Sequence, residues 1–200
     1  MQEKLKFETV DWEQVYGLLL ELADKIKEMG FKPDVIVGVS RGGWLPARVL
    51  SDLLDNPTLA NIRVGFYVDV YKTVSEPVIT QPVSVSVKDK QVLVVDDITD
   101  TGKSLQLVWE SLMTEAKDVK SVTLYHKAWS CFTPDLYARE TDAWIIFPWE
   151  YYETVKKVGS RLVDEGKSLN AVKNTLVDMG LKETLVTRFV NELYGPQGND

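Results

Sequence analysis

The feature that most restricts the fold is the segment 91–113, where an apolar run leads through a polar turn into a helix. The run is QVLVV (91–95), and a strand that is apolar along its whole length is expected to be buried on both faces. The polar turn is DDITDTG (96–102), and apolar residues then recur at helical spacing up to Met113. A buried strand, a glycine-containing turn and a helix in this order form the basic unit of an α/β fold.

The same order occurs once more near the N-terminus. DVIVGV (34–39) is a second apolar run, SRGG (40–43) is a tight turn, and a helical pattern follows to Leu54. A helix is also expected over 12–29, and further strands are predicted over 64–70, 121–126 and 143–147. Alternating strands and helices predict a mainly parallel central sheet flanked by helices.

Two segments have a different pattern. Residues 71–90 are polar and contain two prolines, which is typical of either a mobile loop or a weak hairpin. Residues 151–200 show helical periodicity, with Ser168 as a helix cap and apolar residues up to Leu193. We therefore expect one domain over 1–150 and a helical C-terminal extension over 151–200.

Composition excludes several classes of protein. The formal net charge is −7, so an acidic surface would repel nucleic acid. Cys131 is the only cysteine, which excludes an internal disulfide framework and fits a reducing compartment. No stretch reaches the length of a membrane span or has the pattern of a signal peptide. These observations predict a cytoplasmic protein without a nucleic-acid or membrane partner.

The segment DTGKS (100–104) has the chemistry of a phosphate site. The first amides of a helix have no partner inside the helix, and the positive end of the helix dipole favours an anion. Gly102 allows close approach of the backbone, while Thr101 and Ser104 add hydroxyl donors. Two acids, Asp96 and Asp97, would repel a phosphate in the same cradle, so we expect them to bind sugar hydroxyls or a metal ion nearby.

Two other interpretations of this segment account for less of its pattern. A strand-end turn followed by an ordinary helix cap explains DTGKS alone, but not the complete order of apolar strand, two acids and DTGKS. A Walker-type nucleotide loop is excluded because its distant first glycine is missing.

VLVVDDITDTGKS (92–104) resembles the signature of type I phosphoribosyltransferases, and SRGG (40–43) resembles the pyrophosphate loop of the same family. The resemblance extends over about residues 12–150, with 71–90 standing where the family has a flexible active-site loop. It implies the type I phosphoribosyltransferase fold, with a small hood beside the sheet.

The resemblance also implies roles for individual residues in binding 5-phosphoribosyl-1-pyrophosphate. Asp96 and Asp97 would hold the ribose hydroxyls, directly or through Mg²⁺, which is the implied cofactor. The 5-phosphate would be bound by one turn, which consists of Asp100, Thr101, Gly102, Lys103 and Ser104. Pyrophosphate would be bound by Ser40, Arg41, Gly42 and Gly43, in the family often with a cis peptide bond. For Arg41, the alternative to pyrophosphate binding is an ordinary solvated arginine in a turn. Lys72 is expected to be either a pyrophosphate ligand or a solvated loop lysine.

A base site is expected around LYHKAWS (124–130) and DAWIIFPWE (142–150). Lys127 can donate to a 6-oxo group, and Trp144 can stack on a purine ring, although each alone fits a surface lysine or a core tryptophan. The combination resembles the 6-oxopurine branch, which implies that Ile145 and Glu150 contact the base through main-chain atoms. Ile146 and Phe147 depart from the polar residues of the xanthine–guanine enzyme.

Asp100 is the candidate catalytic residue. An oxopurine loses a ring proton as its nitrogen attacks C1 of the ribose, and a nearby carboxylate can accept that proton. In the family, aspartate at this position favours hypoxanthine or guanine over adenine or uracil. His126 is expected to be structural because strand alternation points it away from Lys127, and Cys131 has no spacing of a metal or nucleophile site.

The implied reaction is purine salvage: ribose 5-phosphate passes to hypoxanthine or guanine, giving IMP or GMP and pyrophosphate. The partners are phosphoribosyl pyrophosphate and a purine base, in a homo-oligomer that is a dimer or a tetramer. Three alternatives stay open at this point: a regulator that binds phosphoribosyl pyrophosphate without turnover, an enzyme for adenine, xanthine or a pyrimidine, and a helical interaction module on an inactive transferase domain.

Overall fold

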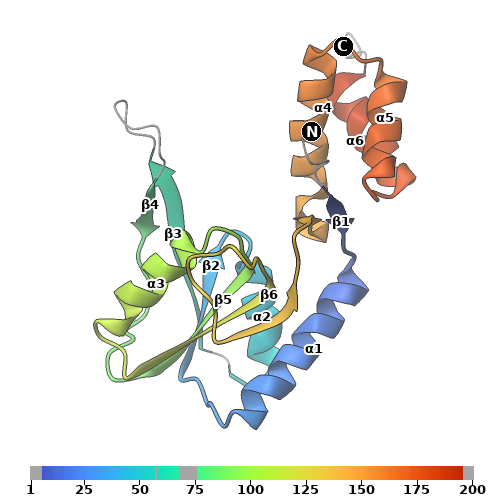
Figure 1. The fold of residues 1–200 in the computed structure, drawn as a ribbon. Helices are drawn as coiled ribbons and strands as arrows, with labels where there is room; N and C mark the ends of the chain where they lie inside the picture. The colour runs from blue at the N-terminus through green and yellow to red at the C-terminus, as the bar shows by residue number, and fades with distance from the viewer. Residues whose placement is uncertain (1–5, 57, 68–75, 196–200) are drawn as a thin grey trace. The chain divides into compact units, whose positions relative to one another are not determined.

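The computed structural model describes residues 6–56, 58–67 and 76–195 (Figure 1). Contacts divide the chain into two compact units. The sheet unit runs from Val15 to Asp142, and the terminal unit combines Met1–Gln14 with Ala143–Asp200.

The sheet unit contains a six-stranded sheet in the order β4-β3-β2-β5-β6-β7. All neighbouring pairs are parallel except β3 and β4, so β4 is an antiparallel edge strand. The strands are β2 (Val35–Ser40), β3 (Leu59–Tyr67), β4 (Glu76–Gln81), β5 (Gln91–Thr99), β6 (Asp118–His126) and β7 (Leu136–Glu140).

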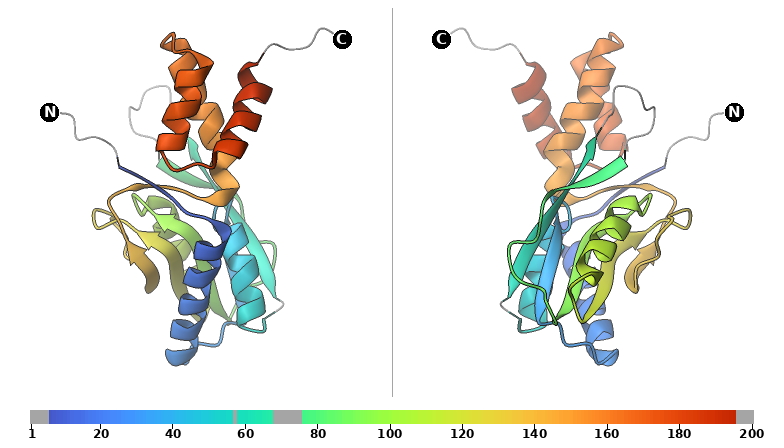
Figure 2. Two further views of the ribbon diagram at one scale, coloured as in Figure 1. Left: turned by 90° about the vertical axis from the view of Figure 1, so that its right-hand side faces the viewer. Right: turned by 90° about the vertical axis from the view of Figure 1, so that its left-hand side faces the viewer.

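Helices cover both faces of this sheet. The helix α3 (Lys103–Met113) lies on one face, while α2 (Trp44–Leu53) and the part of α1 (Trp12–Glu28) from Val15 onward lie on the other (Figures 1 and 2). The α3 face is a continuous apolar core in which Leu105, Val108 and Leu112 pack on the inward residues of β2 and β5. Strands covered on both sides have to be apolar throughout, which explains the runs 34–39 and 91–95.

The strand order brings three functional segments to one edge of the sheet. β5 pairs with β2 on one side and with β6 on the other, in parallel register. The carboxyl ends of these three strands carry SRGG, DDITDTG and the loop that begins at Lys127. Parallel α/β sheets bind their ligands at this edge.

The terminal unit joins the two ends of the chain. A two-stranded parallel ribbon pairs β1 (Phe7–Thr9) with β8 (Trp144–Ile146), and a short 3₁₀ helix, η1 (Pro148–Glu150), follows. Three helices complete the unit: α4 (Tyr151–Asp164), α5 (Leu169–Asp178) and α6 (Glu183–Tyr194). Ile146 from the ribbon is fully buried among the apolar residues of these helices.

Hydrogen bonds fix the ribbon to the helices. The Tyr151 hydroxyl donates to the Val10 carbonyl at 2.6 Å, and the Thr9 hydroxyl donates to the Met179 carbonyl at 2.7 Å. Thr9 of β1 and the next residue, Val10, are therefore hydrogen-bonded to the C-terminal part of the chain. The helices of that part pack around Val155, Val172 and Leu176.

The expected α/β class, mostly parallel sheet and helical tail are confirmed, with local differences. β3 begins at Leu59, five residues before the predicted start, and residues 68–70 lie outside the described residues. The predicted strand 143–147 is found as β8, but it pairs with β1 and not with the central sheet. The division at residue 150 stays a prediction. None of the described helices is both long and apolar enough to span a membrane.

Candidate functional site

The SRGG turn lies directly against the end of β5. A Cβ atom built on Gly42 would overlap the Asp97 carboxylate, and one built on Gly43 would come within 2.7 Å of the Asp96 Cα and closer still to the Val95 carbonyl. Only glycine fits at either position without movement of its neighbours. Two motifs that are more than fifty residues apart in the sequence therefore form one site.

The turn itself has an unusual backbone. The peptide bond between Ser40 and Arg41 is cis, as the resemblance implies. The Asn61 side chain donates to the Ser40 hydroxyl at 3.3 Å, and the Gly43 amide donates to the Val39 carbonyl at 2.9 Å. The Arg41 side chain is exposed beside this turn.

The two acids at the end of β5 differ from surface carboxylates. Asp97 is only 7% exposed. Asp96 is partly exposed as a residue, yet burial of its carboxylate raises its pKa well above the usual range, and the neighbouring Asp97 charge raises that pKa further. The Asp97 amide donates to Asp96 Oδ1 at 3.0 Å, which partly offsets this effect. A pair of adjacent, poorly solvated carboxylates is well suited to binding a cation or hydroxyl groups.

The turn before α3 has the geometry of an anion site. Gly102 caps the helix with φ = +83°, a left-handed conformation that favours glycine. Lys103 and Ser104 follow as the first residues of α3, where backbone amides lack partners inside the helix. A neighbouring loop supports the turn, because the Cys131 amide donates to the Thr101 carbonyl at 3.0 Å.

Trp129 is a functional candidate that sequence reasoning missed. Its indole Nε1 donates to Asp100 Oδ1 at 3.2 Å, and its ring lies 5.1 Å from Lys127 Nζ. Lys127 is 4% exposed, so it is not an ordinary surface lysine. The structure thus joins the candidate catalytic acid and the candidate base-reading lysine through one aromatic ring. The signal for Trp129 that the sequence does contain is an aromatic residue two positions after a lysine at the end of a strand.

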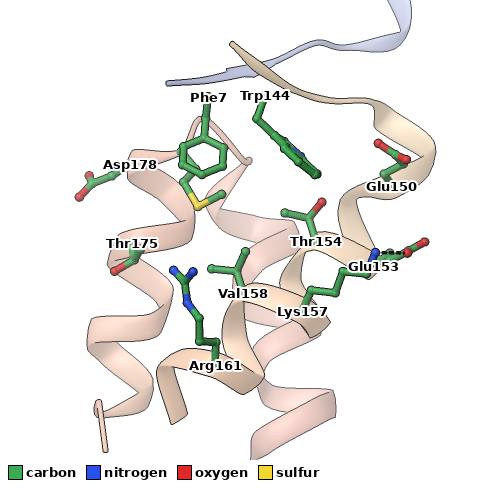
Figure 3. Close-up of a pocket in the computed structure, with 11 residues that line it drawn as sticks. Phe7, Trp144, Glu150, Glu153, Thr154, Lys157, Val158, Arg161, Thr175 and Asp178 are labelled. Atoms are coloured by element: carbon green, nitrogen blue, oxygen red, sulfur yellow. Dashed lines mark ion pairs between the residues drawn. The ribbon is translucent and has the colours of Figure 1, made fainter. Parts of the chain in front are cut away.

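The remaining base-site candidates belong to the terminal unit. Trp144 is 55% exposed, and Trp144 and Glu150 both line a cavity of about 650 Å³ in this unit (Figure 3). The Ile145 side chain is buried. Ile146 and Phe147 are also buried, which explains why apolar residues stand at these two positions. Lys127 belongs to the sheet unit, so its pairing with Trp144 in one base site stays a prediction.

Other candidates have simpler environments. His126 is buried, and its ring centroid lies 4.8 Å from that of Tyr137, in keeping with a structural role. Lys103 forms an ion pair with Glu76 on the edge strand β4, at 3.1 Å. β4 pairs antiparallel with β3, so this part of the segment 71–90 is the second strand of a hairpin. Lys72 lies outside the described residues.

The acids fit a magnesium ion that is held partly by substrate. Within the described ranges, no group of three or more His, Cys, Asp or Glu side chains is arranged as a complete metal site. Mg²⁺ is commonly held by one or two carboxylates together with substrate phosphates and water. Asp96 and Asp97 are two such carboxylates, and they lie beside the SRGG turn.

Comparisons with known proteins agree with this geometry. The model of the phosphoribosyl transferase domain family matches residues 10–155. A xanthine-guanine phosphoribosyltransferase of Cereibacter sphaeroides is 34% identical over 161 residues, which cover 75% of this chain and 92% of that protein.

Two solved structures extend the comparison. A purine phosphoribosyltransferase from Pyrococcus horikoshii has 44% identity and a TM-score of 0.64, over 71% of this chain and 92% of that one. The xanthine-guanine-hypoxanthine phosphoribosyltransferase of Helicobacter pylori has 25% identity and a TM-score of 0.63, over 76% and 98% of the two chains.

Proposed function

We infer that this chain, which belongs to the phosphoribosyltransferase family, is a purine phosphoribosyltransferase that transfers ribose 5-phosphate from phosphoribosyl pyrophosphate to a 6-oxopurine. The observation that carries this inference is the meeting of the SRGG turn with Asp96 and Asp97 beside the DTGKS turn. That arrangement provides separate places for pyrophosphate, ribose and 5-phosphate along one edge of the sheet.

Each part of the proposed site has a distinct task. The turn from Asp100 to Ser104 binds the 5-phosphate through backbone amides and hydroxyls. Asp96 and Asp97 accept hydrogen bonds from the ribose hydroxyls. The turn from Ser40 to Gly43 binds pyrophosphate, and Lys72 is proposed to reach it as well. Holding both ends of the substrate fixes C1 of the ribose for attack.

The proposed reaction is a displacement at that carbon. The bond between C1 and the pyrophosphate oxygen breaks, a purine ring nitrogen bonds to C1, and the ring proton passes to the Asp100 carboxylate. Donation from the Trp129 indole holds this carboxylate in place. Mg²⁺, which the two acids are proposed to hold, would neutralise charge on the leaving pyrophosphate. The lid predicted over residues 71–90 is not carried into this proposal, because β4 pairs with β3 and Val87 is buried in the core, while residues 71–75 lie outside the described residues.

A direct test measures pyrophosphate release from phosphoribosyl pyrophosphate and Mg²⁺ with hypoxanthine, guanine, xanthine, adenine, uracil and orotate. We expect release with hypoxanthine or guanine. Binding of phosphoribosyl pyrophosphate without release for any base would instead support a regulator. We also propose a homo-oligomer in the cytoplasm, which light scattering and cell fractionation can examine.

The carboxylate pair is tested by replacing both Asp96 and Asp97 with asparagine. Asparagine keeps the size of the side chains but removes the charge, so the fold should persist with an unchanged or raised Tm. We expect KM for phosphoribosyl pyrophosphate to rise at least about tenfold and its dependence on Mg²⁺ to weaken, because a charged ligand pair is lost. Normal kinetics and normal Mg²⁺ dependence in this variant would show that the acids do not bind the sugar.

Base selection is tested at Lys127. Its ammonium can donate to a 6-oxo group, whereas a 6-amino group is itself a donor, so that adenine would place a donor against the buried charge. Lys127→Met, which keeps the length of the side chain, should reduce kcat/KM for hypoxanthine and guanine and narrow the difference from adenine. A full preference for oxopurines in Lys127→Met would place recognition of the 6-position elsewhere.

Trp144→Ala provides the contrasting case. Stacking tolerates any purine, so this variant should raise KM for all purines by similar factors, provided its Tm shows that the ribbon survives. A selective effect on one base would show that the indole reads the edge of the base rather than its face.

A further inference from the structure

A second cavity of the terminal unit is walled mainly by aromatic rings. Its volume of about 450 Å³ lies within the range of roughly 300–1,000 Å³ that is usual for small-molecule sites. Every described lining residue belongs to the terminal unit, and neither Trp144 nor Glu150 is among them. This cavity is therefore separate from the one in Figure 3. Its aromatic lining residues are Trp12, Trp149, Tyr151, Tyr152 and Phe189.

Contacts between aromatic side chains hold these rings in place. The ring centroids of Trp12 and Trp149 lie 5.7 Å apart, and the two planes are inclined at 53°. Phe147, which does not line the cavity, stacks on one face of Trp149 with the centroids 4.8 Å apart. Tyr152 and Phe189 meet edge to face at 5.1 Å. Rings that are fixed before a ligand arrives lose little conformational entropy when it binds.

Two of the rings leave much of their surface open to a ligand. Trp12 is 57% exposed and Tyr152 is 41% exposed, although both line the cavity. The face of an aromatic ring attracts a cation within about 6 Å of its centroid, and tryptophan does so most strongly. Several such rings around one cavity are typical of sites that bind alkylated ammonium groups.

Charged side chains of both signs complete the lining. Asp11 and Glu13 flank the first residue of α1, and Lys182 is the N-cap residue of α6. Burial raises the pKa of the Tyr151 hydroxyl, and the Asp11 charge raises that pKa further, so this carboxylate acts on the ring cluster. Lys182 and the positive end of the α6 dipole attract an anion. The lining thus combines attraction for a cation with attraction for an anion.

We propose that this cavity binds a small zwitterion that carries an alkylated ammonium group and a carboxylate a few bonds apart. The ammonium lies against the Trp12 and Tyr152 rings. Asp11 and Glu13 balance its charge, and Lys182 pairs with the carboxylate. A simple cation would instead be repelled by Lys182, and a simple anion by the two acids. The inference does not rest on the proposed function, because none of these residues takes part in the proposed transfer.

Glycine betaine is the probe for this site, because two analogues of nearly the same shape each remove one of its charges. The anion of tert-butylacetic acid replaces the ammonium nitrogen by carbon, and choline replaces the carboxylate by a hydroxymethyl group. Isothermal titration calorimetry is expected to show saturable binding of betaine at millimolar or lower concentrations, with Kd at least about tenfold higher for each analogue. Absence of betaine binding, or equal Kd values for the three compounds, overturns the inference.

Charge variants distinguish the two ends of the ligand. Lys182→Met should raise Kd for betaine at least about tenfold but leave choline binding unchanged or tighter. The double change Asp11→Asn and Glu13→Gln should weaken both betaine and choline. Asp11 Oδ1 accepts from the Gln14 amide at 2.9 Å, and asparagine caps a helix equally well, so α1 should persist. If Lys182→Met weakens the two compounds equally, the carboxylate is not read by this lysine and the inference is wrong.

Trp12→Leu tests the aromatic wall, with Tyr16→Leu as its matched control. Trp12→Leu keeps an apolar side chain but removes the ring face, so Kd for betaine should rise at least about tenfold. Tyr16 lies one turn further along α1, is 50% exposed and does not line the cavity, so Tyr16→Leu should leave Kd unchanged. If Trp12→Leu lowers Tm, Tyr152→Leu takes its place. Unchanged betaine affinity in the folded variant overturns the inference.

Discussion

Asp100→Asn is expected to lower kcat for the forward reaction by roughly 10- to 1,000-fold, with a much smaller effect on binding of phosphoribosyl pyrophosphate. Asparagine keeps the shape of the side chain and can still accept a hydrogen bond from the Trp129 indole. It cannot take the proton that the purine loses. Single-turnover measurements of pyrophosphate release, combined with direct binding of phosphoribosyl pyrophosphate, separate the two effects.

Trp129→Phe is the companion variant for this prediction. It removes the hydrogen bond to Asp100 but keeps an aromatic ring beside Lys127. A positioning role predicts a smaller loss of kcat than in Asp100→Asn, and little further loss when both changes are combined. If Asp100→Asn weakens binding while bound substrate still turns over at the normal rate, Asp100 serves only as part of the phosphate turn.

Gly43→Ala is expected to have the second large effect, on both stability and turnover. The added methyl group would meet the Val95 carbonyl and the Asp96 Cα, which are backbone atoms that cannot rotate away. Crowding of this kind costs on the order of 1–3 kcal/mol, and here it would also separate the pyrophosphate turn from the carboxylates. We expect urea unfolding to report the loss of stability and pyrophosphate release to fall by at least about 100-fold.

Two other glycines provide controls. Gly42→Ala meets the Asp97 side chain rather than backbone, so it should reduce turnover with a smaller loss of stability. Gly17 lies inside α1, where an added methyl group would meet no atom within 4 Å, so Gly17→Ala should stabilise by about 0.5–1 kcal/mol without changing kinetics. Equal stability of Gly43→Ala and the wild type would show that the two motifs are not in contact.

The central sheet and the glycine turn before α3 were predictable because their signals are local. β2 and β5 are buried on both faces and must be apolar throughout, and Gly102 marks a turn that its left-handed φ requires. Helical spacing likewise identified α1 and α3. The family resemblance implied that SRGG and DDITDTG bind one substrate, whereas the contact of Gly42 with Asp97 is known only from the structure.

The missed elements are those whose stability comes from contacts distant in the sequence. β1 has three residues and no apolar alternation, and it exists as a strand because β8 pairs with it. β7 is a short edge strand that is mostly exposed. α4 was predicted only as part of the helical extension over 151–200, although its buried residues Tyr151, Val155 and Leu162 recur at helical spacing. The link from Trp129 to Asp100 depends on a loop conformation that no periodicity encodes.

The pairing of β1 with β8 sets an order of events during protein synthesis. The sheet unit is continuous from Val15 to Asp142, so it can fold as soon as that stretch has left the ribosome. β1 is made first, yet it must wait for β8 and for the helices that hold it. Closing so long a loop makes this a late step. A nascent chain would therefore carry a folded sheet unit before the ribbon that contains Trp144 exists.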